Sequence, residues 1–278
     1  MAYRTIVAVI QNELDHDRLL NFVLPFARQN EAHVIGCHAE ALPVSYTTPM
    51  GFPDVALVQE TTAVNEERAK AMASVFSQRT AAEGIPSEWR SIESFSGDSA
   101  LSALSAARSA DLMISMHPGS SDASFSQANL ETLLAEAGRP MIFVPPEGAL
   151  PTSFSRILIA WNGSREATRA VFDALPLLKR SDIVEILTID AERNGERDAA
   201  TGKQIAASLS RHGINTRITD TASSNSDVAT RIQEHVESTR PDLVVMGGYS
   251  RSWLREFLFG GTTRAMLKAM PAAIFMSR

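Results

Sequence analysis

The chain has 278 residues, of which 44% are hydrophobic and 21% are charged, a balance typical of folded globular proteins and not of disordered or collagen-like chains. The formal charge of −6 gives no basic surface for nucleic acid. The single cysteine, Cys37, excludes an internal disulfide and indicates a small buried side chain. The apolar stretch after Arg4 is too short for a signal peptide or a membrane span, so we expect a cytoplasmic protein that contacts no membrane.

The chain contains one internal repeat. Residues 4–9 resemble residues 156–161 at an offset of 152, whereas Asp111 matches Asp242 at an offset of only 131. The smaller offset means that the first copy carries extra residues between these anchors, and the stretch Leu42–Asn65, with its three prolines, is the expected place.

The repeat predicts two domains, residues 1–146 and residues 153–278. The segment between them, residues 145–151, contains three prolines and a glycine, as linkers often do.

Apolar runs that fit strands alternate with one-sided helical patterns along each copy. In the second copy the expected strands are 156–161, 183–189, 215–221, 242–246 and 272–276, and the expected helices are 167–178, 198–213, 227–240 and 262–270. This alternation predicts α/β architecture with two Rossmann-like domains, each a mainly parallel five-stranded sheet flanked by helices. Ligands of such sheets bind at the carboxyl ends of the strands, here the loops after Trp161, Ile189 and Met246.

The loop after Met246 is rich in glycine. Glycines at 247 and 248 would let a backbone approach a ligand, and glycines at 260 and 261 precede a predicted helix whose first N–H groups favour a phosphate. The same glycines also fit tight turns, with Thr262 as a plain helix cap.

The spacing Gly247-x2-Ser250-x9-Gly260-Gly261-Thr262 resembles the nucleotide loop of universal stress protein domains. The strand 157–161 with Asn162-Gly163-Ser164 adds to the likeness, which extends over both copies and implies a tandem universal stress protein with the adenine nucleotide alpha hydrolase-like fold. The resemblance implies a stress-response function and a site for ATP, with Mg²⁺, in the second copy. The positions carried over are Asn162, Ile189, Gly247, Ser250, Gly260, Gly261 and Thr262.

Three positions depart from the family pattern. Ser250 stands for a glycine, Gly261 for a serine or threonine, and Asn162 for an aspartate. The first alternative is therefore an interaction module that binds no nucleotide. The second is a slow ATP hydrolase, although no residue near the loop is placed as a general base, and we name no catalytic residue.

The first copy lacks this glycine pattern. Met116, His117, Gly119, Asn129, Leu130 and Glu131 stand opposite Gly247, Gly248, Ser250, Gly260, Gly261 and Thr262, and Ile10 stands opposite Asn162. We expect this copy to be a structural partner, or to bind something other than a phosphate through the stretch Leu42–Asn65.

Two further signals are weighed and declined. Gly97-Asp98-Ser99 resembles a serine-hydrolase block, but its counterpart at Asp227 begins a helix, so capping is the expected role of Asp98. The six histidines show no ligand spacing, so no metal site is expected beyond the Mg²⁺ of a nucleotide.

The last strands of the two copies, Met141–Val144 and Ala273–Met276, would each leave an unpaired sheet edge. We expect them to pair with one another, so that the two domains form an intramolecular pseudo-dimer, as strands of this family do across a two-fold axis. A homodimer and protein clients are further options that the sequence leaves open.

Overall fold

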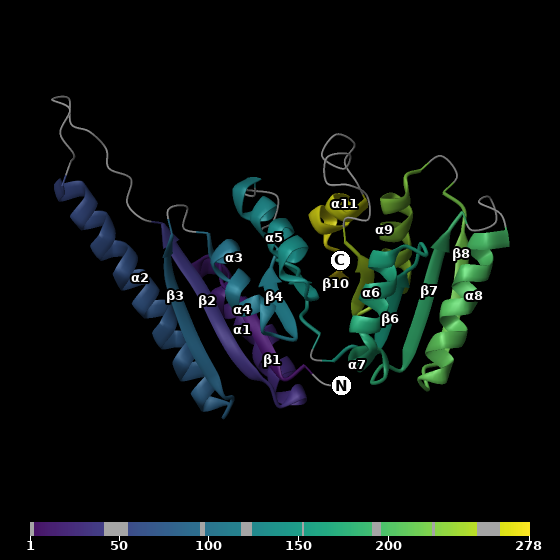
Figure 1. The fold of residues 1–278 in the computed structure, drawn as a ribbon, viewed down its shortest axis with the longest axis horizontal. Coiled ribbons are helices and arrows are strands. Elements are labelled where there is room, and N and C mark those ends of the chain that lie inside the picture. The colour runs from purple at the N-terminus through teal and green to yellow at the C-terminus, as the bar shows by residue number, and fades with distance from the viewer. Residues whose placement is uncertain are drawn as a thin grey trace. The chain divides into compact units, whose positions relative to one another are not determined.

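The protein was analysed as a computed structural model, which describes residues 3–41, 55–94, 98–117, 124–151, 153–190, 196–223, 226–248 and 262–278. Helices and strands alternate along these residues (Figure 1). They fall into two compact units, one made of residues 3–116 and 124–137 and the other of residue 117 and residues 138–278.

The first unit is built on a parallel sheet in the order β3-β2-β1-β4. Its strands are β1 (Thr5–Val9), β2 (His33–Ala41), β3 (Ser87–Ser94) and β4 (Leu112–Met116). Its helices are α1 (Glu13–Asn30), α2 (Val55–Ala82), α3 (Ser99–Ser102), α4 (Leu104–Arg108) and α5 (Ser124–Ala137). Helices α1 and α2 pack together, as do α3 and α5. Because β1, β2 and β3 follow one another in one direction and β4 lies on the other side of β1, right-handed crossovers place these two pairs on opposite faces of the sheet.

Local sequence explains these elements. Asn12 caps α1, its side-chain oxygen accepting a hydrogen bond from the Asp15 backbone N–H at 2.9 Å. The helix ends at Glu31 in the left-handed region, with φ of 48°. Strand β4 is buried along its whole length, as expected of a central parallel strand covered on both faces.

The second unit contains a sheet in the order β5-β10-β9-β6-β7-β8. Its strands are β5 (Met141–Val144), β6 (Arg156–Ala160), β7 (Ile183–Ile189), β8 (Thr216–Thr221), β9 (Leu243–Gly247) and β10 (Ala273–Ser277). Its helices are α6 (Arg165–Asp173), α7 (Leu175–Leu178), α8 (Glu196–Arg211), α9 (Val228–Thr239) and α11 (Thr262–Ala269). The predicted α/β class, with mainly parallel strands flanked by helices, is therefore confirmed, and the described residues of each sequence repeat provide five strands.

Strand β5 comes from the first sequence repeat but lies in the sheet of the second unit. It runs antiparallel to β10, with Ile274 opposite Phe143, so the predicted pairing of these two strands is confirmed. The domain limits 1–146 and 153–278 follow the sequence repeat and stay a prediction.

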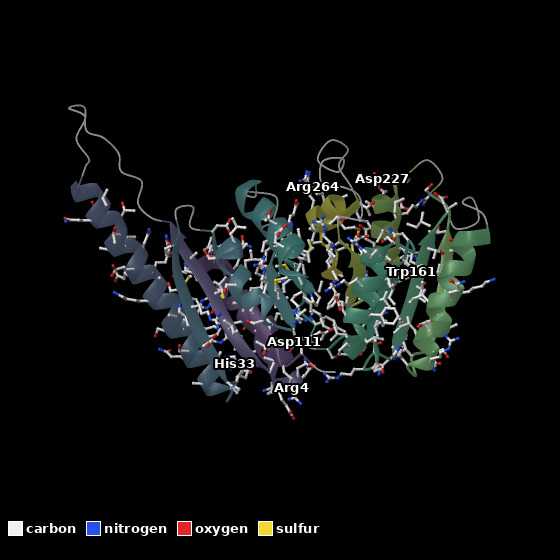
Figure 2. The ribbon with its side chains drawn as sticks, in the orientation of Figure 1. Arg4, His33, Asp111, Trp161, Asp227 and Arg264 are labelled. Atoms are coloured by element: carbon white, nitrogen blue, oxygen red, sulfur yellow. The ribbon has the colours of Figure 1, made fainter. Side chains whose placement is uncertain are left out.

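The repeat is visible in matching hydrogen bonds at the amino-terminal ends of the strands. The Asp111 carboxylate accepts from the backbone N–H groups of Arg4 and Thr5 at 2.8 and 3.0 Å, and the Asp242 carboxylate accepts from the backbone N–H of Arg156, the counterpart of Thr5, at 2.8 Å. Figure 2 labels Arg4 and Asp111 at this end of the first sheet.

The strand pairing corrects one detail of the predicted alignment. Ile10 N–H donates to the Cys37 carbonyl and Trp161 N–H donates to the Leu187 carbonyl, each at 2.9 Å, so Ile10 is the counterpart of Trp161. The residue in the place of Asn162 is therefore Gln11, and the prediction of Ile10 was wrong. The predicted offset of 152 matches Arg4 with Arg156, whereas in the structure the Asp111 N–H donates to the Thr5 carbonyl and the Asp242 N–H donates to the Arg156 carbonyl, so Arg156 is the counterpart of Thr5.

Candidate functional site

The carboxyl ends of three neighbouring strands form the candidate site in the second unit. Strand β6 pairs with β7 on one side and with β9 on the other. The chain runs from β6 to β7 and β8 on one side and then crosses back to β9, so the strand order reverses at β6. Asn162 follows β6, Ile189 ends β7 and Gly247 ends β9. The structure therefore brings these three predicted residues to one edge of the sheet.

The other predicted positions are in part outside the described residues. Ser250, Gly260 and Gly261 lie there, and their predicted roles stay predictions. Thr262 is the first residue of α11, as predicted, and the first turn of that helix contains no acidic residue. The amino-terminal end of α11 is thus free of the negative side chain that would repel an anion.

Asn162 shapes the turn that leads into α6. Its side-chain oxygen accepts from the Ser164 backbone N–H at 3.0 Å, and Gly163 between them has a φ of 70°. Ser164 in turn caps α6 by accepting from the Ala167 backbone N–H at 3.1 Å. Asn162 itself is exposed, and within the described part of the chain its amide NH₂ has no hydrogen-bond partner. The amide can therefore donate to a ligand while the oxygen keeps its structural role.

Ile189 is half-buried and lies opposite Thr221 of β8. The next residue, Asp190, adopts a left-handed conformation with φ of 58°, and its carboxylate accepts from the Ser223 backbone N–H at 3.0 Å. The strand therefore ends at Ile189, which is the last apolar residue of β7.

Gly247 is required by packing inside the protein. A Cβ atom built at this position would lie 2.5 Å from the Ala167 backbone nitrogen and 2.7 Å from the Glu166 carbonyl carbon. The first turn of α6 thus lies directly against the end of β9, and no larger residue fits without moving backbone. The sequence predicted that Gly247 lets a ligand approach the backbone. The close packing of α6 is by itself enough to explain why a glycine stands at this position.

Trp161 is a feature of this edge that the sequence did not single out. Its side chain is buried, and its indole N–H has no hydrogen-bond partner in the described parts of the chain (Figure 2). A buried donor without a partner costs about 1–3 kcal/mol. The signal available in the sequence was a bulky amphipathic residue directly before Asn162, at the end of a strand that otherwise contains aliphatic residues.

The corresponding edge of the first unit is closed by the chain's own side chains. The Gln11 amide donates to the Ser115 hydroxyl at 3.2 Å and, with longer geometry, to the Met116 carbonyl at 3.4 Å. Met116 occupies the place of Gly247, and Glu131, opposite Thr262, is buried. The predicted absence of a phosphate cradle in this repeat stays a prediction, because residues 118–123 lie outside the described residues.

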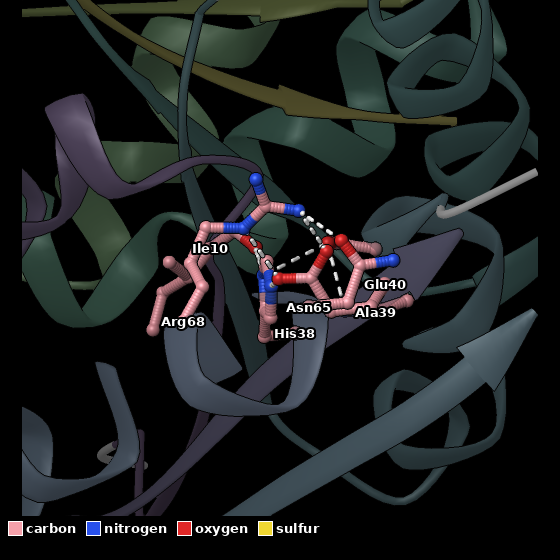
Figure 3. A network of polar contacts seen from close by, with 7 residues as sticks. Ile10, His38, Ala39, Glu40, Asn65 and Arg68 are labelled. Atoms are coloured by element: carbon pink, nitrogen blue, oxygen red, sulfur yellow. Dashed lines mark hydrogen bonds and ion pairs between the residues drawn. The ribbon is translucent and has the colours of Figure 1, made fainter. Parts of the chain in front are cut away.

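The segment around Ser99, which resembles a serine-hydrolase block in sequence, lies beside a histidine and a carboxylate (Figure 3). The Ser99 hydroxyl oxygen lies 3.4 Å from His38 Nδ1, and His38 Nε2 lies 2.9 Å from the Glu40 carboxylate, which superficially resembles a catalytic triad. However, His38 Nδ1 lies 2.8 Å from the Ile10 carbonyl oxygen, which can only accept, so this nitrogen carries a proton and cannot take one from the serine.

The backbone contacts of this segment show what it does instead. The Ser99 hydroxyl accepts from the Ala39 backbone N–H at 3.0 Å, and Ser99 is only 3% exposed. Asp98 caps α3, as predicted, by accepting from the backbone N–H groups of Ala100 and Leu101 at 2.8 and 3.0 Å. The segment is structural.

Two other buried groups, the Cys37 thiol and the His117 imidazole, are uncharged at neutral pH. Burial raises the pKa of the Cys37 thiol to about 11, so that it stays protonated and unreactive at neutral pH. Burial lowers the pKa of His117 to about 4, so that this imidazole is neutral.

Residues 153–278 match the family model described as the universal stress protein family. This part of the chain is therefore similar to the domains of universal stress proteins. Comparison with curated protein sequences gives no match.

Solved structures show that the fold of universal stress proteins extends over the whole chain. A universal stress protein from Archaeoglobus fulgidus DSM 4304 superimposes with a TM-score of 0.75 at 17% identity, covering 99% of this chain and 96% of that one. A protein of unknown function from Pseudomonas aeruginosa PAO1 gives a TM-score of 0.60 at 14% identity, covering 99% and 92%. The cytoplasmic domain of a prokaryotic cation chloride cotransporter gives 0.50 at 10% identity, covering 99% and 95%.

In the described parts of the present chain, no helix is both long enough and apolar enough to cross a membrane.

Proposed function

We propose that this universal stress protein is a non-catalytic stress-response regulator that binds one ATP per chain, in its second domain. The proposal rests mainly on one observation, the convergence of Asn162, Ile189 and Gly247 at the carboxyl ends of β6, β7 and β9. The strand order reverses at β6, and open parallel sheets bind their ligands at the carboxyl ends of the strands beside such a reversal.

The described residues fit an adenine nucleotide. The half-buried side chain of Ile189 offers apolar contact to a base, and the unpartnered amide of Asn162 offers a hydrogen-bond donor beside it. The first turn of α11, which begins at Thr262 without an acidic side chain, would favour a phosphate. Bound Mg²⁺ would neutralise charge on the phosphates, and the resemblance assigns the remaining contacts to Ser250, Gly260 and Gly261.

The alternative, an interaction module without a nucleotide, also has an observation in its favour. Packing against α6 is enough to explain Gly247, so this glycine alone is not evidence for a ligand. The family's glycine pattern therefore has to be tested at positions whose role is not already explained by packing.

Equilibrium binding of a fluorescent ATP analogue with Mg²⁺ tests the proposal. Gly260→Asp puts a negative charge beside the proposed phosphate position and should abolish binding. The matched change at the opposite position of the first repeat, Asn129→Asp, should leave the affinity unaltered. Equal losses in both variants would show that the first repeat also binds nucleotide, and no binding by the unmodified protein would favour the interaction module.

The cytoplasm is the proposed location, and unidentified proteins are the proposed clients. Pairing of β5 with β10 supports the pseudo-dimer arrangement of the two repeats, because the pairing of these strands is the contact that the arrangement predicts. Sedimentation of the purified chain over a range of concentrations would distinguish a monomer with this internal pairing from a homodimer.

A further inference from the structure

The carboxyl edge of the second unit contains a buried hydrogen-bond donor that none of the proposed ATP contacts uses. Trp161 directly precedes Asn162, and its side chain is only 7% exposed. Its indole N–H has no hydrogen-bond partner in the parts of the chain that the structure describes (Figure 2). Native proteins pair nearly all of their buried polar groups, so a buried donor of this kind points to a partner that is not part of the folded chain.

The polar groups next to Trp161 in the chain and on the neighbouring strand are already engaged. The Leu187 carbonyl accepts from the Trp161 backbone N–H at 2.9 Å. The Thr188 hydroxyl donates to a carboxylate of β8 at 2.7 Å, and Asn162 Oδ1 accepts from the Ser164 backbone N–H at 3.0 Å. None of these groups accepts from the indole, which leaves its N–H available to a ligand.

The first repeat shows that folding alone does not require an indole at this position. Ile10 is the counterpart of Trp161, because both backbone N–H groups donate to the next strand at the same place. Ile10 is 1% exposed, so an aliphatic side chain fills the corresponding position of the first unit. Tryptophan adds an N–H that is costly to bury without a partner. The repeat that we propose to bind ATP is therefore the one with a donor here.

Trp161 lies on the side of the proposed site that holds the nucleoside. Asn162 follows it directly, and Ile189 is two residues beyond Leu187, to which the Trp161 backbone is bonded. These two residues are the proposed contacts of the base, whereas the phosphates are assigned to the start of α11. The ring nitrogens of adenine, such as N3 and N7, accept hydrogen bonds and match a neutral, buried N–H donor.

We propose that the indole N–H of Trp161 donates a hydrogen bond to a ring nitrogen of adenine, which makes Trp161 a further binding residue of the nucleotide site. The inference rests on the proposed function, the binding of ATP by the second repeat. The base then meets two donors side by side, the indole of Trp161 and the side-chain amide of Asn162. Trp161 thereby favours bases that carry the accepting nitrogen.

Trp161→Phe tests the contact, because phenylalanine keeps an aromatic ring and removes the donor. The Kd for ATP with Mg²⁺ should rise about three- to tenfold, as expected for one lost neutral hydrogen bond. Trp89→Phe is the matched control. Trp89 of β3 also has a buried indole N–H without a partner in the described residues, but it packs against Phe76 in the first unit, with ring centroids 5.2 Å apart. Its replacement should leave the affinity unchanged.

Analogues of ATP identify the accepting atom. Among 1-deaza-, 3-deaza- and 7-deaza-ATP, each of which replaces one ring nitrogen by carbon, one should bind the unmodified chain about three- to tenfold more weakly than ATP. The same analogue and ATP should bind the Trp161→Phe variant equally well, because the donor is already missing there.

Nuclear magnetic resonance of the ¹⁵N-tryptophan-labelled full chain observes the donor directly. The chain has three tryptophans, and the indole signal of Trp161 is the one that Trp161→Phe removes. If that variant does not fold, the signal is the one that remains after Trp89→Phe and Trp253→Phe. It should move downfield and exchange more slowly with solvent when ATP and Mg²⁺ are added.

The results separate this inference from the proposed function. An unmodified chain that binds ATP, with an unchanged Trp161 indole signal or an unchanged Kd in Trp161→Phe, would overturn the role of Trp161 and leave ATP binding in place. Equal losses in Trp161→Phe and Trp89→Phe, or equal binding of ATP and all three analogues by the unmodified chain, would also overturn the contact with the base. An unmodified chain that binds no ATP would overturn both.

Discussion

Replacing Gly247 by alanine is the sharpest test of how the carboxyl end of β9 packs against α6. The added Cβ would lie 2.5 Å from the Ala167 nitrogen, 2.7 Å from the Glu166 carbonyl carbon and 2.9 Å from the Glu166 Cβ. Two of these three atoms are backbone atoms of the first turn of α6, so they cannot move by a simple change of rotamer. Either α6 shifts or β9 does.

The magnitude follows from the size of the overlap. Overpacking of a well-packed region costs about 1–3 kcal/mol, and a clash with backbone belongs at the upper end, so we expect a loss of about 3 kcal/mol in the free energy of unfolding. For a unit of this size that corresponds to a fall in melting temperature of roughly 6–12 °C. Urea denaturation followed by circular dichroism, together with a thermal melt, measures both quantities.

Gly202→Ala is the matched control. Gly202 lies inside α8, and its added Cβ would meet the Thr188 Cγ2 at 3.4 Å, an ordinary contact. Alanine also favours a helix over glycine by about 1 kcal/mol, so this variant should be as stable as the unmodified protein or more stable. If Gly247→Ala is no less stable than Gly202→Ala but loses ATP binding, the packing explanation of Gly247 is wrong and the glycine serves a ligand alone.

Three further predictions concern single residues. Ser250→Gly should tighten ATP binding by roughly tenfold if the serine is held in a strained backbone conformation, because relief of about 1–3 kcal/mol exceeds the loss of one hydrogen bond; titration calorimetry would show weaker binding if the hydroxyl is a ligand. Because burial lowers the pKa of His117 to about 4, the unfolded chain binds the extra proton below pH 6.5, so stability should fall as the pH drops from 6.5 to about 4. A His117→Asn variant should show a flatter pH dependence in urea melts, and an unchanged slope would contradict the assignment. Asp227→Ala removes the cap of α9, whose Oδ1 accepts from the Thr230 backbone N–H at 2.7 Å, and should cost about 1 kcal/mol in a thermal melt, whereas no loss would mean that the cap is dispensable.

Much of the architecture could be predicted from periodicity and the internal repeat. The strand predicted at 183–189 has those limits in the structure, and the caps Asp98 and Asp227 hold the positions that the repeat indicated. These features follow from local rules, namely apolar runs for buried strands and short polar side chains for helix starts.

The site was harder to predict because its details depend on contacts between distant segments. That Gly247 is needed by α6 is visible only when Glu166 and Ala167 are brought against β9, which no spacing in the sequence shows. The same holds for Trp161, whose indole N–H is an unpartnered donor only because of its surroundings.

The register of the repeat failed for a related reason. Matching Arg4 with Arg156 set the offset of the strand one residue too high, because two short apolar runs look alike at either offset, so Ile10 was placed where the structure has Gln11. The hydrogen bonds from Arg68 of α2 to Glu40 of β2 (Figure 3) were missed because the two residues lie 28 positions apart in the sequence, and each alone has an ordinary local explanation.

Titration calorimetry of the purified full chain with ATP and Mg²⁺ tests the central proposal most directly. We predict saturable binding with a stoichiometry of one ATP per chain, and loss of that binding in the Gly260→Asp variant but not in the Asn129→Asp variant. A stoichiometry of two, or no heat of binding at any ATP concentration up to several millimolar, would contradict it.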